Sequence, residues 1–272
     1  MTATTDTPTT AQVLRRIHDD GARRGHVWTT PTVDGVVHGD DSRPLSGIAV
    51  TWMSTMPVLR AAADRGCDLV ISHEPTFWHH RDEPPTEAGA ALHRRKQEWL
   101  DEHGMTVVRF HDHHHAMFDV DPVLDALFER FGWRDETVGP TLYGRSHVGP
   151  VDLRTLAGRI AQAVGEEAVR AVGDPDALVR TLGYGAHDLA GCLAPLRDAE
   201  AVLVGEVREW DAFEYFRDAA HFGLDASLIA TSHRALENWA SEPTVRWLAE
   251  LVPEVAVLPI DTPAPFRVHR VG

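Results

Sequence analysis

Cysteine is scarce in this chain of 272 residues, which contains only Cys67 and Cys192. Because the two lie far apart in apolar surroundings, we expect neither a disulfide framework nor a thiolate zinc site. The chain also lacks a run of about 20 apolar residues, the length that crosses a bilayer, and a signal-like apolar leader. These absences predict a cytoplasmic protein with no membrane partner, in which residues 1–10 form a disordered N-terminus.

Positive charge is sparse as well. The 26 Lys and Arg residues face 41 Asp and Glu residues, the net charge is −15, and no basic run offsets it. Nucleic-acid surfaces need clustered basic residues, so this class of partner is excluded, whereas an acidic field suits metal cations. The sequence has neither a Gly-x-Ser-x-Gly elbow nor a P-loop, and therefore offers no serine nucleophile and no triphosphate cradle.

Apolar periodicity predicts alternating helices and strands, with enough apolar residues (43%) for a sizeable core. We expect helices at 11–24, 55–65, 88–103, 121–131, 152–164 and 211–221, and strands at 48–51, 69–71, 107–110, 168–172, 179–182, 201–204, 228–230 and 255–260. Residues 35–46 read as a loop, and residues 140–150 as a domain boundary. The prediction is therefore an α/β protein with two lobes (about 11–140 and 150–272), whose mixed sheets face a central metal-containing cleft.

The most unusual stretch is Arg109-Phe110-His111-Asp112-His113-His114-His115, which follows a predicted buried strand. α/β proteins build sites at such strand ends, and imidazoles mixed with carboxylates suit zinc, iron, nickel, copper or manganese. A solvated histidine-rich loop is the alternative. If the strand continues, alternate side chains share a face, so His111, His113 and His115 are the better ligand candidates and Asp112 an outer partner.

Two further strand ends carry a histidine and a carboxylate. His73 and Glu74 end one strand, and Ser232-His233 follows another, with Glu237 four residues later. If a helix begins at His233, this spacing places His233 and Glu237 on one face, one turn apart. Such a pair by itself is usually only a surface pair, but three strand ends with the same donors favour a metal site.

Taken in order, these motifs resemble those of the NIF-three-like family. Residues 69–75 are similar to that family's strand and His-His-Pro turn, residues 110–115 to its Ala-His-Thr-Asn-Leu-Asp, and residues 204–212 with 232–237 to its Gly-Asp-Val-x-x-x-Asp-Ala and Gly-His-x-x-x-Glu. The resemblance runs from about Asp34 to Glu237. It implies a NIF-three-like domain spanning residues 11–272, in which the 204–237 motif shares one site with lobe one, and a homohexamer with a dinuclear metal centre.

The resemblance also implies the ligands of two divalent metal ions, with zinc, iron or manganese favoured. They are His73, Glu74, His115, His233 and Glu237. Glu74 stands where the family has a histidine and His115 where it has an aspartate, so the set keeps three histidines and two carboxylates. The bridging role then falls to Glu237, aided by Glu74. A single metal or no metal, with Asp112 as a substitute ligand, are the alternatives.

Two ions that share a water molecule promote hydrolysis. We therefore predict a metal-dependent hydrolase acting on a small molecule, a cyclic amide or amidine or a nucleotide-like compound, as the description GTP cyclohydrolase I type 2 for the family implies. His111 and His113 are the expected general acids because imidazole titrates near neutral pH, and Glu237 is the catalytic carboxylate. His187, where the family has a Gly/Ser-rich turn, bears on substrate selection. A non-catalytic metal-binding scaffold or regulatory protein is the alternative.

Overall fold

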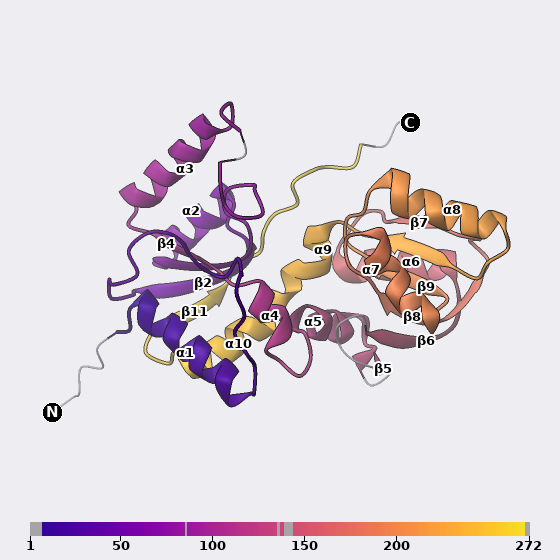
Figure 1. The fold of residues 1–272 in the computed structure, drawn as a ribbon, viewed down its shortest axis with the longest axis horizontal. Coiled ribbons are helices and arrows are strands. Elements are labelled where there is room, and N and C mark those ends of the chain that lie inside the picture. The colour runs from indigo at the N-terminus through magenta and orange to yellow at the C-terminus, as the bar shows by residue number, and fades with distance from the viewer. Residues whose placement is uncertain (1–6, 85, 135–136, 139–143, 270–272) are drawn as a thin grey trace. The chain divides into compact units, whose positions relative to one another are not determined.

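The computed structural model describes residues 7–84, 86–134, 137–138 and 144–269 and shows the expected alternation of helices and strands (Figure 1). The chain forms two compact units, residues 1–122 with 240–263, and residues 123–239 with 264–272. The chain thus divides near residue 122 and not at 140–150. Its last helix and strand return to complete the first unit. Of the predicted disordered stretch, residues 1–6 lie outside the described residues, whereas Thr9 caps the first helix.

The first unit is built on a five-stranded sheet in the order β1-β4-β3-β2-β11. Its strands are β1 (Gly35–His38), β2 (Gly47–Met53), β3 (Leu69–Glu74), β4 (Thr106–Arg109) and β11 (Ala256–Pro259). The last four are parallel, and β1 adds antiparallel at the edge. The sequence predicted a loop in place of β1, because four residues with an irregular register show no measurable alternation. Since β3 and β4 are parallel neighbours, their carboxyl ends meet at one edge of the sheet.

Helices cover both faces of this sheet, since its central strands are apolar on both sides. On one face Ile48, Ile71 and Val108 pack against α1 (Thr10–Arg23) and α10 (Ser241–Leu251). On the other, Ala49, Val70 and Val107 pack against α2 (Met56–Asp64) and α3 (Ala90–Glu102). In the described part of the chain, no helix combines the length and the apolar character needed to span a membrane.

The second unit is built on a six-stranded sheet in the order β5-β6-β8-β9-β10-β7. The strands are β5 (Thr137–Val138), β6 (Arg145–Asp152), β7 (Arg170–Val172), β8 (Leu178–Tyr184), β9 (Ala201–Val204) and β10 (Ser227–Ala230). β8, β9 and β10 run parallel, and the other pairs are antiparallel. β6 occupies part of the predicted boundary. An irregular register after His147 hides this strand from a period-two search.

Helices follow the parallel strands of the second unit. α7 (Leu189–Leu193) and α8 (Glu214–His221) pack on one face through Cys192 and Phe216, which meet Val202 and Leu228 of the sheet. α6 (Leu153–Val164), capped by Asp152, buries Leu156 and Ile160. The short helix α9 (His233–Glu237) follows β10 directly. The remaining helices are α4 (Asp112–Ala116) and α5 (Pro122–Phe131).

Candidate metal centre

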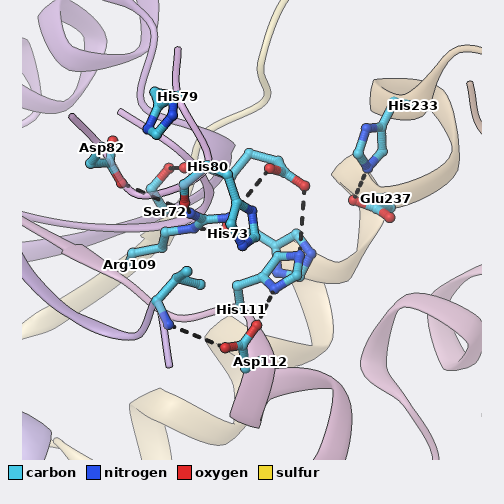
Figure 2. A network of polar contacts seen from close by, with 12 residues as sticks. Ser72, His73, His79, His80, Asp82, Arg109, His111, Asp112, His233 and Glu237 are labelled. Carbon is cyan, nitrogen blue, oxygen red and sulfur yellow. Dashed lines mark hydrogen bonds and ion pairs between the residues drawn. The ribbon is translucent and has the colours of Figure 1, made fainter. Parts of the chain in front are cut away.

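Three imidazoles meet at the carboxyl ends of β3 and β4 in the first unit. His73 belongs to β3, His111 follows β4, and His115 lies in α4. The ring centroid of His73 is 4.5 Å from that of His111 and 4.7 Å from that of His115, and the last two are 5.0 Å apart. One nitrogen of each ring lies within 4.8 Å of the others, which makes the group a candidate metal site. We call these three residues the imidazole cluster; His73 and His111 are labelled in Figure 2.

A helical turn brings His111 and His115 together. The Asp34 carboxylate accepts hydrogen bonds from the backbone N–H groups of His111 (2.6 Å), Asp112 (3.0 Å) and His113 (2.8 Å), and so satisfies the first donors of α4. Four residues apart, His111 and His115 then project to the same side of the turn. The expected strand, which placed His111, His113 and His115 on one face, is therefore wrong at this point.

His113 and His114 are buried and take part in other contacts. Nδ1 of His113 lies 2.7 Å from Asp34 Oδ2, its Nε2 accepts a hydrogen bond from the Thr29 backbone N–H (3.1 Å), and its ring stacks on Trp28. Nε2 of His114 lies 2.8 Å from Thr244 Oγ1. With both ring nitrogens engaged by the protein, His113 does not have the geometry of the general acid that the sequence suggested.

A carboxylate holds the Nδ1 atom of two members of the imidazole cluster. Asp112 Oδ1 lies 2.9 Å from Nδ1 of His111, and Asp121 Oδ2 lies 2.8 Å from Nδ1 of His115. Burial raises the pKa of Asp112, but hydrogen bonds from His111, Val33 and Thr32 outweigh this effect and lower the pKa to about 2. A carboxylate at Nδ1 directs coordination to Nε2, which is how carboxylates orient metal-binding histidines.

His111 is neutral near pH 7. Burial, and then the neighbouring imidazoles of His73 and His115, lower the pKa of His111 to about 4, against the influence of Asp112 and Glu74. Neutral imidazole is the form that binds a metal. The predicted role of His111 as a proton donor required a pKa near neutral pH, and its pKa is much lower. The geometry favours a role for His111 as a metal ligand.

Replacing Asp121 with asparagine should weaken metal binding about 10–100-fold, because the amide cannot hold His115 with the charge that raises the basicity of its ring. Asp112→Asn should act in the same way through His111. Competition with a chromophoric chelator measures both constants. Asp101→Asn is the matched control, since Asp101 also contacts an imidazole, His38, at 2.8 Å, and is 69% exposed. Equal losses in all three variants would contradict this interpretation.

Glu74 lies between the imidazole cluster and a buried arginine. Its Oε1 is 3.8 Å from His111 Nε2, and its Oε2 is 3.7 Å from the Arg109 guanidinium. Arg109 is only 1% exposed; its Nε donates to the His73 carbonyl (3.2 Å), and the guanidinium also contacts the His80 carbonyl and lies 4.0 Å from Asp82 (Figure 2). Arg109 therefore fixes the strand end that carries His73 and Glu74.

The single lysine of the sequence, Lys96 in α3, supports the chain after the end of β3, the strand that carries His73 and Glu74. Lys96 is 2% exposed, and its Nζ donates to the carbonyl oxygens of Ser54 (2.7 Å) and Thr76 (2.6 Å). Burial lowers the pKa of Lys96 to about 8, against the attraction of Asp82. The ammonium group thereby joins the loops that follow β2 and β3.

Lys96 should make stability depend on pH above pH 8. Because its pKa in the folded state is below the ordinary value of 10.5, the unfolded chain binds more protons between pH 8 and 10.5. The free energy of unfolding should therefore rise with pH in this interval, relative to a Lys96→Met variant, by about 1–3 kcal/mol. Urea unfolding of both proteins at pH 7.5 and pH 10 tests this. A difference that stays constant or shrinks as pH rises would contradict it.

The second unit presents a different group of donors. Ser232 caps α9 by accepting a hydrogen bond from Ala235 N–H (3.1 Å), so that His233 and Glu237 lie one turn apart as predicted, with Nε2 of His233 2.7 Å from Glu237 Oε2 (Figure 2). His187, which follows β8, places its Nε2 3.3 Å from Glu237 Oε1. We call His187, His233 and Glu237 the carboxylate cluster, a second candidate metal site.

Glu206 contacts this cluster from the end of β9. Its Oε1 lies 3.6 Å from Nδ1 of His233, and the hydrogen bond with His233 lowers the pKa of Glu206. The carboxylate of Glu206 thus faces the ring nitrogen of His233 that does not face Glu237.

The predicted ligands fall into the two units. His73 and His115 meet in the imidazole cluster, with Glu74 beside them, and His233 and Glu237 meet in the carboxylate cluster. His111, a ligand candidate from the strand pattern that the family motifs did not include, lies in the imidazole cluster, and His187, which was not predicted as a ligand, lies in the carboxylate cluster. Both follow within three residues of the end of a strand, and this position was the signal that could have identified His187.

A pocket of about 430 Å3 lies in the first unit next to the imidazole cluster. It is lined by residues 31–37, by residues 80–82 and by Asp112. Asp112 thus borders the pocket and also holds His111. The pocket has the size of a small-molecule site.

Comparison with known proteins agrees with this architecture. A family model described as Duf34/NIF3 (NGG1p interacting factor 3) matches residues 31–265. Similar solved structures are the hypothetical protein SA1388 of Staphylococcus aureus (17% identity, TM-score 0.72, covering 97% of this chain and 100% of that one), and a Bacillus cereus protein related to NIF3 (13%, 0.74, 96% and 99%). A third is TTHA1606 of Thermus thermophilus (19%, 0.65, 95% and 100%). No curated protein matches the sequence. These likenesses confirm the fold.

Proposed function

The chain belongs to the Duf34/NIF3 family, and we propose that it is a metal-dependent hydrolase that binds two divalent ions. One observation carries the proposal: His111 and His115 each have Nδ1 held by a carboxylate while their rings converge with that of His73. A carboxylate at Nδ1 combined with the convergence of three rings is the arrangement of metal-binding histidines. His113, whose Nδ1 also faces a carboxylate, does not take part in that convergence.

The donors fit divalent transition ions. His73, His111 and His115 would hold one ion, and His233 and Glu237 would contribute to a second. Imidazole combined with carboxylate suits zinc, iron and manganese, and the absence of thiolate donors excludes a cysteine-rich site. A bound ion of this kind lowers the pKa of a coordinated water toward neutrality and polarises a carbonyl or amidine group. The shared dinuclear centre remains a prediction from the family motifs.

The side chains around the imidazole cluster suit proton transfer. Glu74 directs one oxygen toward His111 and the other toward Arg109, so that it is held beside the cluster and can accept a proton there. His111 and His113 lack the geometry or titration of a general acid. In the proposal Glu74, which the family motifs predicted as a ligand, therefore transfers the proton instead: it accepts the proton as a base and returns it as an acid. Glu237, buried between two imidazoles, serves as the carboxylate of the other cluster.

The substrate proposed is a small cyclic amide or amidine, or a nucleotide-like compound. The family motifs suggest this class, and the pocket beside Asp112 offers room for it. The net charge of −15 favours a substrate that is not strongly anionic. The proposal includes a homohexameric assembly, and light scattering would measure its mass in solution.

Protein purified without a histidine tag should contain close to two equivalents of metal by elemental analysis, and should hydrolyse a member of a panel of cyclic amides and purine nucleotides. Glu74→Gln should lower kcat about 10²–10⁴-fold, the range of general acid–base catalysis, without lowering metal content. Glu209→Gln, at a side chain that is 83% exposed, is the control. Bound metal without turnover of any compound on the panel would favour a non-catalytic metal-binding scaffold. If the protein binds no metal even after supplementation, both the hydrolase and the scaffold are excluded.

A further inference from the structure

We propose that His187 is a metal ligand, and that the second unit holds a divalent cation through His187, His233 and Glu237. The family motifs place no ligand at position 187. The inference rests on the metal binding proposed above, but it does not depend on hydrolysis.

The spacing of the donor atoms matches a shared ion. Glu237 offers its two oxygens to different rings, with Oε2 2.7 Å from Nε2 of His233 and Oε1 3.3 Å from Nε2 of His187. Zinc–nitrogen bonds of about 2.0–2.1 Å place neighbouring ligand atoms of a tetrahedral ion about 3.3 Å apart. Small shifts of the Glu237 side chain therefore suffice to surround an ion with all three donors.

Charge also favours a cation among these three groups. The rings of His187 and His233 lie 4.0 Å apart between centroids, beside the carboxylates of Glu237 and Glu206. Imidazole and carboxylate donors gathered in this way suit a divalent transition-metal ion. A divalent ion bound by two neutral rings and one carboxylate satisfies every donor. Glu206 faces Nδ1 of His233, and a carboxylate on that side directs coordination to Nε2.

The backbone around His187 is fixed on both sides. Two residues before it, Gly185 N–H donates to the Leu203 carbonyl (3.0 Å), and one residue after it, Asp188 caps α7 by accepting from Gly191 N–H (2.7 Å). This frame fixes the backbone from which the imidazole projects, as a metal site requires.

Gly205 packs directly against the same ring. A Cβ atom at position 205 would lie 3.0 Å from Cε1 of His187 and 3.1 Å from Cα of His233. A methyl group there would press on both, so the His187 ring or the backbone at His233 would have to shift by a few tenths of an ångström. Gly205→Ala should therefore weaken binding of the second ion while leaving the imidazole cluster unchanged.

A cysteine at position 187 offers a direct test. In His187→Cys loaded with Co2+, a thiolate ligand should give a near-ultraviolet sulfur-to-cobalt charge-transfer band, because thiolate is a strong ligand for such ions. His221→Cys, at an exposed position of the same unit, is the matched control and should show no band, as should His187→Ala, which retains the buried Cys67 and Cys192. A His187→Cys protein without the band, or a wild-type protein that binds no cobalt, would overturn the proposal.

Metal stoichiometry gives the second readout. His187→Ala should raise the dissociation constant of one of two bound ions at least about tenfold and leave the other unchanged, and Gly205→Ala should reproduce the effect. Unchanged binding of both ions in both variants would contradict the role of His187. Because neither experiment measures turnover, a failed search for hydrolysis would leave the inference intact.

Discussion

Arg109→Met should lower the free energy of unfolding by about 3–5 kcal/mol, the cost of leaving buried carboxylates without their cation. Arg109 is 1% exposed and lies against Glu74 and Asp82, whose side chains are 13% and 10% exposed. It also donates to the His73 carbonyl. The variant loses both the charge and the hydrogen bonds, and urea unfolding at pH 7.5 measures the difference from wild type.

The deficit of this variant should shrink as pH falls. Burial raises the pKa of Asp82, and Arg109 opposes that rise, so removal of Arg109 raises this pKa further. A carboxyl group whose folded-state pKa is raised contributes stability below that pKa, and the contribution is lost as pH rises through it. The gap between variant and wild type should therefore be smaller at pH 5 than at pH 8. Arg81→Met, at an exposed neighbouring position, is the control, and an equal effect there would show that Arg109 has no special role.

His73→Ala should raise the dissociation constant of one metal ion by more than about 100-fold. His73 is a direct member of the imidazole cluster, with its ring centroid 4.5 Å and 4.7 Å from those of the other two members. Its loss should therefore cost more affinity than the roughly 10–100-fold expected when only a carboxylate behind a ligand is changed. Isothermal titration of the metal-free protein with Zn2+ measures the change. Turnover, once a substrate is found, should fall in parallel.

Two variants separate loss of a ligand from general disturbance. His79→Ala removes an imidazole from the loop after β3, outside the cluster, and should bind metal as wild type does. His73→Asn keeps polarity at a position that is 6% exposed, and should lose metal like the alanine variant. Tight metal binding by His73→Ala would show that the imidazole cluster is not a metal site.

The sequence predicted most elements of the fold because their patterns are local. Ile48 to Thr51, Leu69 to Ile71 and Ala201 to Val204 are short apolar runs bounded by turns, and each is a strand. The spacing of His233 and Glu237 is also local, since Ser232 supplies the helix cap. β1 and β6 escaped prediction because their pairing with distant strands defines them, and their own residues carry little periodicity.

The histidine tract shows where a local pattern fails. Alternation along a strand grouped His113 with His111 and His115, but Asp34, almost 80 residues earlier in the sequence, binds the backbone of this segment and starts a helix. His113 is then buried against Trp28, whereas His111 and His115 stay together on one side of the turn. No pattern within residues 109–115 separates His113 from the other two.

By itself, the sequence determined the donor types, their positions at strand ends, the alternating α/β order and the family, since each of these depends on composition or on neighbours along the chain. Only the tertiary structure decided which histidines face one another, which carboxylates hold them, and that His187 joins His233 and Glu237. Those outcomes depend on contacts between segments far apart in the chain. They are set by the packing of whole strands and helices, which no short run of residues specifies.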